Sequence, residues 1–102
     1  MNIISNDCGS YIRLMVEGRV DTNTSPQFQQ AILNAFQKKN DIVIDFLNVP
    51  AVSSAGLRAL LIGQKTAASK RGSMKLTNVN TVVKNVLDMS GFSSILTVEE
   101  TV

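Results

Sequence analysis

Two adjacent serines, Ser53 and Ser54, stand where an apolar segment leads into a predicted helix. The segment Ile42–Phe46 is expected to form a buried strand, because it is apolar almost throughout. Backbone N–H groups at a helix start lack intrahelical partners and carry partial positive charge, so a serine oxygen can cap them and a phosphate is favoured there. The turn therefore predicts a phosphorylation switch, and simple helix capping by the two serines is the competing interpretation.

The sequence contains no histidine and a single cysteine, Cys8. A serine hydrolase normally needs a general base beside its nucleophile, and here only a lysine or a carboxylate could serve. The nucleophile-elbow pattern Gly-x-Ser-x-Gly is incomplete around Ser54, because Val52 stands where the first glycine should be. The sequence offers neither a thiolate zinc site nor a phosphate-cradling glycine loop. We therefore expect a protein with no catalytic residues, no metal and no cofactor.

The composition is typical of one soluble domain that spans residues 1–102. Hydrophobic residues make up 44% of the chain and charged residues 18%, which suits a globular core. The formal net charge of +2, the scattered lysines and arginines, and the absence of tryptophan argue against nucleic acid binding. No apolar run approaches the roughly 20 residues that cross a bilayer, and the amino terminus lacks a signal-peptide pattern. We expect a cytoplasmic protein that binds neither nucleic acid nor membrane.

The first half of the chain predicts two strands and an amphipathic helix. Alternating polar and apolar residues indicate a strand at Tyr11–Glu17, preceded by a short strand at Ile3–Ile4. A helix is expected to begin at Thr24 or Ser25, with Pro26 in its first turn. Its apolar residues recur with helical spacing and should face the core: Phe28, Ala31, Ile32, Ala35 and Phe36.

The second half continues the alternation of helix and strand. The helix after the serines should stop near Gly72. A strand at Met74–Thr77, a third helix that begins at the cap residue Asn80, and a last strand at Ile95–Val98 follow. The buried side of the helix after the serines is expected to carry Leu57, Leu60, Leu61 and Ala68. This order predicts an α/β domain with one mixed β-sheet of four to five strands flanked by helices.

Four segments at characteristic spacings carry a family resemblance. They are Gly18–Asp21, Asp45 at the end of an apolar strand, Val52–Leu57 and Val83–Gly91. Together they resemble the STAS domain of bacterial anti-sigma factor antagonists over almost the whole chain. The resemblance implies a domain that binds an anti-sigma factor with serine kinase activity and thereby releases a sigma factor. It also implies that phosphorylation of one serine in the turn ends this binding and that a serine phosphatase restores it.

The resemblance places the phosphorylation site at Ser54, two residues before Gly56. Ser53 stands where many members have aspartate, and Ala55 replaces a second hydroxyl found in some members, so Ser53 remains the alternative acceptor. The family often adds another helix at the carboxyl end, whereas this chain ends at Val102. Contacts from that region are therefore not carried over.

Several residues around the turn are candidates for contact with a partner. Arg58, four residues after Ser54, could pair with a phosphate or bind the partner, and a solvated surface arginine is an equal alternative. Asp21 lies in a loop that the family places beside the serine turn, where contact with the kinase competes with a local loop role. Asp45 is expected to fix its turn through backbone hydrogen bonds rather than to bind a partner. The predicted partner-binding set is Asp21, Ser53, Ser54, Gly56 and Arg58.

Two functional classes remain open besides the antagonist that is switched by phosphorylation. A STAS adaptor subunit of a membrane transporter or lipid-transport complex would use the same fold as a structural part. A serine-dependent enzyme is disfavoured by the missing histidine and the missing elbow. Family analogy predicts that the protein is a monomer that docks on a kinase dimer.

Overall fold

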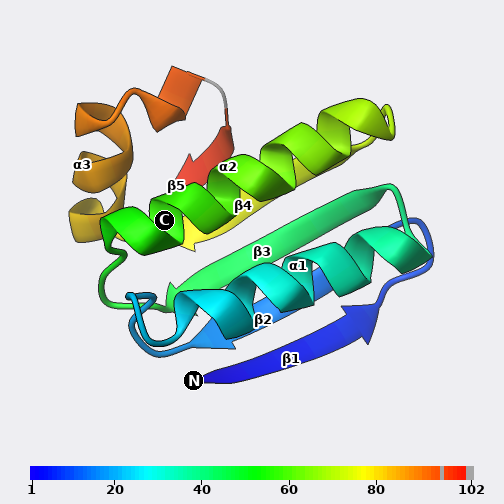
Figure 1. Ribbon diagram of the computed structural model, residues 1–102, viewed down its shortest axis with the longest axis horizontal. Coiled ribbons are helices and arrows are strands. Elements are labelled where there is room, and N and C mark those ends of the chain that lie inside the picture. Colours follow the sequence, from blue (N-terminus) through cyan, green and yellow to red (C-terminus); the bar gives the residue numbers. More distant parts are fainter. Residues whose placement is uncertain (95, 101–102) are drawn as a thin grey trace.

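Five strands form one sheet whose spatial order repeats their order along the chain, β1-β2-β3-β4-β5 (Figure 1). The computed structural model describes residues 1–94 and 96–100. Strand β1 pairs antiparallel with β2, and the remaining neighbours pair in parallel. The predicted mixed sheet is thus confirmed. The strands are β1 (Asn2–Asp7), β2 (Ile12–Glu17), β3 (Asp41–Asn48), β4 (Ser73–Val79) and β5 (Thr97–Glu100).

The helices lie in the crossovers between parallel strands. Because each crossover moves in the same direction across the sheet and such connections are right-handed, the helices collect on one face. Figure 1 shows the first two helices side by side over the sheet and the third at the end where β4 finishes. The helices are α1 (Ser25–Lys38), α2 (Ser54–Ser69), α3 (Thr81–Met89) and a short 3-10 turn, η1 (Phe92–Ser94).

The core lies between the sheet and the helices. Helix α1 buries Phe28, Ile32, Ala35 and Phe36, as its apolar spacing predicts, and Ala31 packs at the edge of the same cluster. Residues 12–16 of strand β2 alternate between buried and half-buried, as expected for a strand covered by helices on one face. These elements position the loops at the carboxyl ends of the parallel strands.

The prediction for the buried side of α2 was partly wrong. Leu57 and Leu60 are buried, but Leu61 is only half-buried and Ala68 is exposed. The close contacts of α2 use small residues instead, because a Cβ atom at Gly63 would lie 2.7 Å from Sδ of Met74 and 2.9 Å from a methyl carbon of Ile32. The buried residues of α2 are Gly56, Leu57, Ala59, Leu60, Gly63 and Ala67.

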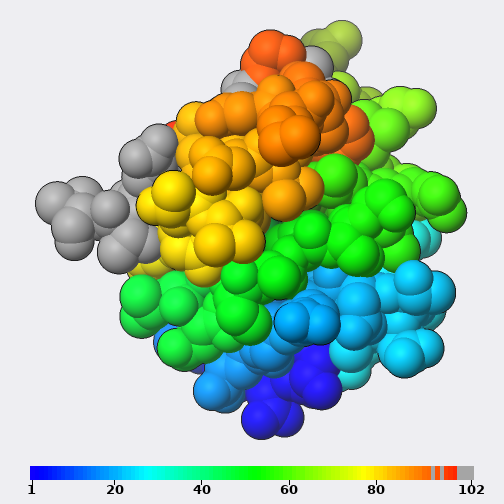
Figure 2. Space-filling model, turned by 90° about the vertical axis from the view of Figure 1, so that its left-hand side faces the viewer, coloured from blue at the N-terminus to red at the C-terminus, as the bar shows by residue number. Residues whose placement is uncertain are grey.

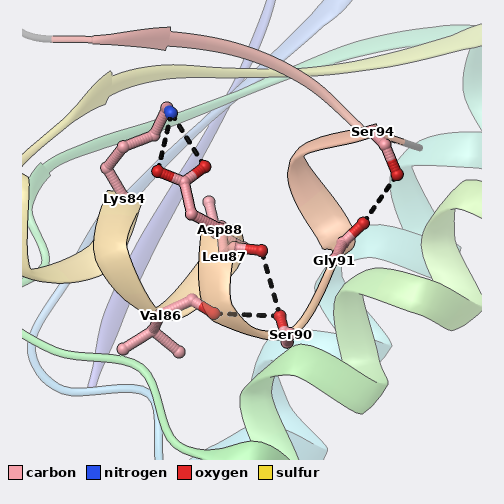
Figure 3. Close-up of polar contacts among 7 residues, drawn as sticks. All are labelled: Lys84, Val86, Leu87, Asp88, Ser90, Gly91 and Ser94. Carbon is pink, nitrogen blue, oxygen red and sulfur yellow. Dashed lines mark hydrogen bonds and ion pairs between the residues drawn. The ribbon is translucent and has the colours of Figure 1, made fainter.

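Helix α3 begins and ends with side-chain contacts to its own backbone. The amide of Val83 donates to the side chain of Asn80, which confirms the predicted cap. At the other end, Oγ of Ser90 donates to the carbonyls of Val86 and Leu87 (Figure 3). Figure 3 also shows Val86 on the opposite side of the helix from the ion pair between Lys84 and Asp88.

The last strand begins later than predicted. Of the expected strand Ile95–Val98, Ile95 lies outside the described residues, Leu96 precedes the strand, and β5 begins at Thr97. Strand β1 is longer than the predicted Ile3–Ile4. Within residues 1–94 and 96–100, no helix combines the length and apolar content needed to cross a bilayer.

Candidate functional site

Ser53 and Ser54 differ sharply in the exposure of their side chains to solvent. Helix α2 begins at Ser54, an exposed residue, and Ser53 is the N-cap with extended backbone angles. The Oγ atom of Ser53 is buried, makes no hydrogen bond among the described residues, and does not cap the helix. The competing interpretation, in which these serines are simple helix caps, is therefore wrong for the side chain of Ser53. The exposed serine is therefore the residue predicted as the phosphate acceptor.

The loop after β2 holds the serine turn on one side. The amide of Ser53 donates to the carbonyl of Val20 at 2.8 Å, and the amide of Val20 donates to the carbonyl of Ala51 at 3.1 Å. Val20 and Val52 therefore form an isolated parallel bridge between two loops. Sequence reasoning missed both valines, because an isolated bridge has no periodicity that a sequence pattern could reveal.

Gly56 allows these loops to approach α2 closely. It is buried, and a Cβ atom there would lie 2.7 Å from a methyl carbon of Val52 and 2.8 Å from one of Val20. Because real Cβ atoms do not approach so closely, the packing requires glycine at this position. Gly56 was predicted only as a partner-binding residue, and the structure shows that it also has a packing role.

The start of α3 holds the serine turn on the other side. Nδ2 of Asn80 donates to the carbonyl of Val49 at 2.9 Å, while Oδ1 of the same side chain accepts from the amide of Val83 at 2.8 Å. Figure 2 shows the resulting surface, in which the green segment around residue 50 lies between the blue loop after β2 and the yellow and orange α3. Three segments distant in sequence therefore meet at one end of the sheet.

Asp21 lies directly after Val20 and organises the start of α1. Its carboxylate accepts hydrogen bonds from the amides of Asn23 and Thr24, at 2.9 and 3.1 Å. The hydrogen bond from the backbone of Thr24 is the main cause that lowers the pKa of Asp21 below its usual value. The loop of Asp21 lies beside the serine turn, and its predicted contact with a partner stays a prediction.

Arg58 is exposed one helical turn after Ser54. The first turn of α2 contains no acidic residue, so nothing in that turn opposes a negative charge at the helix start. Ser54, Arg58 and the half-buried Asp21 thus lie around one end of the domain, whereas Gly56 lies beneath the surface. No group of three or more metal-binding side chains occurs among the residues that the structure describes.

Asp45 is buried, with 3% of its surface exposed. Burial raises the pKa of its carboxyl, but hydrogen bonds from Asn78, Leu47 and Arg13 outweigh it and leave the pKa below the usual value. The amide of Leu47 donates to Oδ1 at 2.9 Å, which confirms the predicted backbone contact. Nδ2 of Asn78 donates to the same oxygen at 3.0 Å, and Arg13 forms an ion pair with Oδ2. Asp45 therefore fixes the end of β3.

The model of the STAS domain family matches residues 4–102. The chain belongs to the STAS domain family. An anti-sigma F factor antagonist from Paenibacillus polymyxa is 31% identical to this STAS domain over 83 residues, which cover 79% of this chain and 71% of the relative. The suspected family membership is thus confirmed by sequence.

Solved structures confirm the STAS fold. An anti-sigma factor antagonist from Mycobacterium paratuberculosis has a TM-score of 0.87 at 20% identity, with 99% of this chain and 86% of that chain covered. The phosphorylated form of the Bacillus cell fate determinant SpoIIAA has a TM-score of 0.73 at 16% identity, covering 95% and 90%. A sulfate transporter family protein from Wolinella succinogenes has a TM-score of 0.76 at 16% identity, covering 88% and 76%.

Proposed function

We propose that this STAS domain is a cytoplasmic anti-sigma factor antagonist controlled by phosphorylation of Ser54. Its unphosphorylated form binds an anti-sigma factor with serine kinase activity and thereby releases a sigma factor. A serine phosphatase reverses the modification. The domain acts by binding and has no catalysis of its own. The name of the Paenibacillus polymyxa relative supports the antagonist role.

The exposure of Ser54 carries the proposal. A kinase needs an accessible hydroxyl, and the structure exposes Ser54 while it buries Oγ of Ser53. The start of α2 can receive a phosphate on its free amides, with Arg58 one turn away as a further cation. Ser54 is therefore favoured over Ser53 as the acceptor.

The switch acts through charge while the fold stays intact. A phosphoryl group adds about two negative charges at neutral pH. A partner that fits a neutral hydroxyl would have to desolvate this dianion or place its own nucleotide phosphates against it. Like charges placed together across an interface cost several kcal/mol, and about 1.4 kcal/mol is a factor of ten in affinity. A loss of affinity of roughly a hundredfold or more is expected.

Phosphorylation in vitro tests the proposal. The purified protein is incubated with ATP and the serine kinase anti-sigma factor of the same genome, and the modified residue is located by mass spectrometry. We expect phosphate on Ser54 in the parent and in Ser53→Ala, and none in Ser54→Ala. Phosphate on Ser53 would correct the site, and absence of modification at either serine would contradict the switch.

A STAS adaptor subunit of a transporter or lipid-transport complex is the second candidate. The likeness to the sulfate transporter family protein supports it at the level of the fold. Its signature would be stable copurification with a membrane transporter together with no phosphorylation of the serine turn.

A further inference from the structure

The side chain of Asn80 makes two hydrogen bonds in different directions. Its oxygen accepts from the amide of Val83 and caps α3, whereas its nitrogen donates to the carbonyl of Val49. An asparagine side chain carries its acceptor and its donor on separate atoms, whereas an ionised carboxylate only accepts. Capping requires the oxygen alone. The Nδ2 donor of Asn80 is therefore not needed for the cap and instead binds the loop between β3 and α2.

That loop determines where Ser54 stands. Val49 begins it and Ser53 ends it. Two backbone hydrogen bonds to Val20 fix its last part, and these do not depend on side-chain identity. The amide of Val49 donates to the carbonyl of Phe46, and this bond also needs no particular side chain. The hydrogen bond to the carbonyl of Val49, in contrast, depends on the residue at position 80. Asn80 therefore ties the first part of the loop to the start of α3.

We propose that Asn80 is a positioning residue for the phosphorylation switch. Its amide joins the start of α3 to the loop that carries Ser54 and holds the acceptor hydroxyl where the kinase can use it. This inference rests on the proposed function. Small displacements of a reacting group lower the rate of a bound substrate strongly, by as much as about a hundredfold for 1 Å. Loss of the donor should therefore lower kcat for phosphorylation of Ser54 more than it raises KM.

The substitution Asn80→Asp separates the two roles. Aspartate caps helices as well as asparagine does, so α3 keeps its cap. An ionised carboxylate cannot donate to the carbonyl of Val49 and repels it instead. Asn80→Ser is the uncharged second variant, because serine also caps a helix but is shorter. Asn85→Asp, at an exposed position of α3, is the matched control for the change in charge.

Two measurements test the proposal. Amide hydrogen exchange measured by NMR reports the loop directly, through the amides of Val20 and Ser53, and reports the cap through the amide of Val83. Steady-state phosphorylation by the anti-sigma factor kinase with ATP gives kcat and KM. In Asn80→Asp and Asn80→Ser we expect exchange at Val20 and Ser53 to rise about tenfold or more with the amide of Val83 still protected. We expect kcat to fall about tenfold with KM changed less than about threefold.

The possible results test the positioning role of Asn80 separately from the proposed function of the domain. It is overturned if both Asn80 variants match Asn85→Asp in exchange at Val20 and Ser53. It is also overturned if exchange rises but kcat stays at the parent value, or if Val83 loses protection together with the loop. If the kinase modifies no serine even in the parent, the proposed function and the positioning role both fail, while the exchange data still decide whether Asn80 fixes the loop.

Discussion

Ser53 and Ser54 are neighbours in the chain, but the Oγ atom of Ser53 is buried and has no hydrogen-bond partner within residues 1–94 and 96–100, whereas Ser54 is exposed at the start of α2. The difference arises from the backbone, since the amide of Ser53 is held against the carbonyl of Val20. This hydrogen bond holds the backbone of Ser53 against the loop after β2, and helix α2 begins at the next residue.

Ser53→Ala should leave the free energy of unfolding unchanged or raise it slightly. A buried hydroxyl without a hydrogen-bond partner carries a desolvation cost of about 1–3 kcal/mol, which alanine removes. The methylene carbon stays, so no large cavity forms. Urea unfolding followed by circular dichroism measures the change. A loss of more than about 1 kcal/mol would show that the hydroxyl has a partner in solution.

Gly56→Ala should destabilise the domain by about 1–3 kcal/mol. The added methyl group would meet the side chains of Val20 and Val52 and also the backbone carbonyl of Val20, which lies 3.2 Å from the Cβ position. Lys65→Ala, at an exposed position of the same helix, is the matched control, because an alanine there meets no packed neighbour. Equal urea midpoints for the two variants would contradict the tight fit at Gly56.

Asp45 should make the stability of the domain depend on acid pH. Its folded pKa lies below the ordinary value of 3.8, so the unfolded chain takes up the proton at a higher pH than the folded protein does. The contribution is fully present above about pH 3.8 and is lost as the pH falls through the lower folded value. In Asp45→Asn this part of the acid loss should disappear, at a cost of about 1–3 kcal/mol at pH 7.

Urea unfolding between pH 7 and pH 2 measures this dependence. Glu17→Gln, which changes an exposed carboxylate at the end of β2, is the control. If Asp45→Asn and the parent lose stability in parallel across the whole range, the carboxylate of Asp45 does not contribute as the structure indicates.

The order of the elements and the core side of α1 could be predicted because large apolar residues recur with the period of each element. The buried side of α2 was harder, since Gly63 and Ala67 make close contacts without a strong hydrophobic signal. The serine turn was recognised from local sequence. The burial of the Ser53 hydroxyl was not, because the fold brings the loop of Val20, a residue 33 positions away, beside the turn.

The hydrogen-bond partners of Asp45 show the same limit of prediction from sequence. Leu47 is only two residues away, and its contact with Asp45 follows from the local turn chemistry of aspartate. Arg13 and Asn78 lie 32 and 33 residues away, on the neighbouring strands β2 and β4. Only the register of the sheet places them around one carboxylate, and a single sequence does not specify that register.

Ser54→Asp should weaken binding to the anti-sigma factor kinase. Ser54→Ala should bind as tightly as the unphosphorylated parent and should keep this affinity after incubation with ATP. Aspartate adds one negative charge at the exposed start of α2 and so reproduces part of the charge of a phosphate. A loss of about tenfold in affinity, or about 1.4 kcal/mol, is expected.

Isothermal titration calorimetry measures this loss of affinity, with Ser69→Asp at the far end of α2 as the control for charge alone. Because the start of α2 tolerates negative charge, the folded state should persist, so the weakening reports the interface and not unfolding. Parent-like affinity in Ser54→Asp would mean that the partner does not approach this turn.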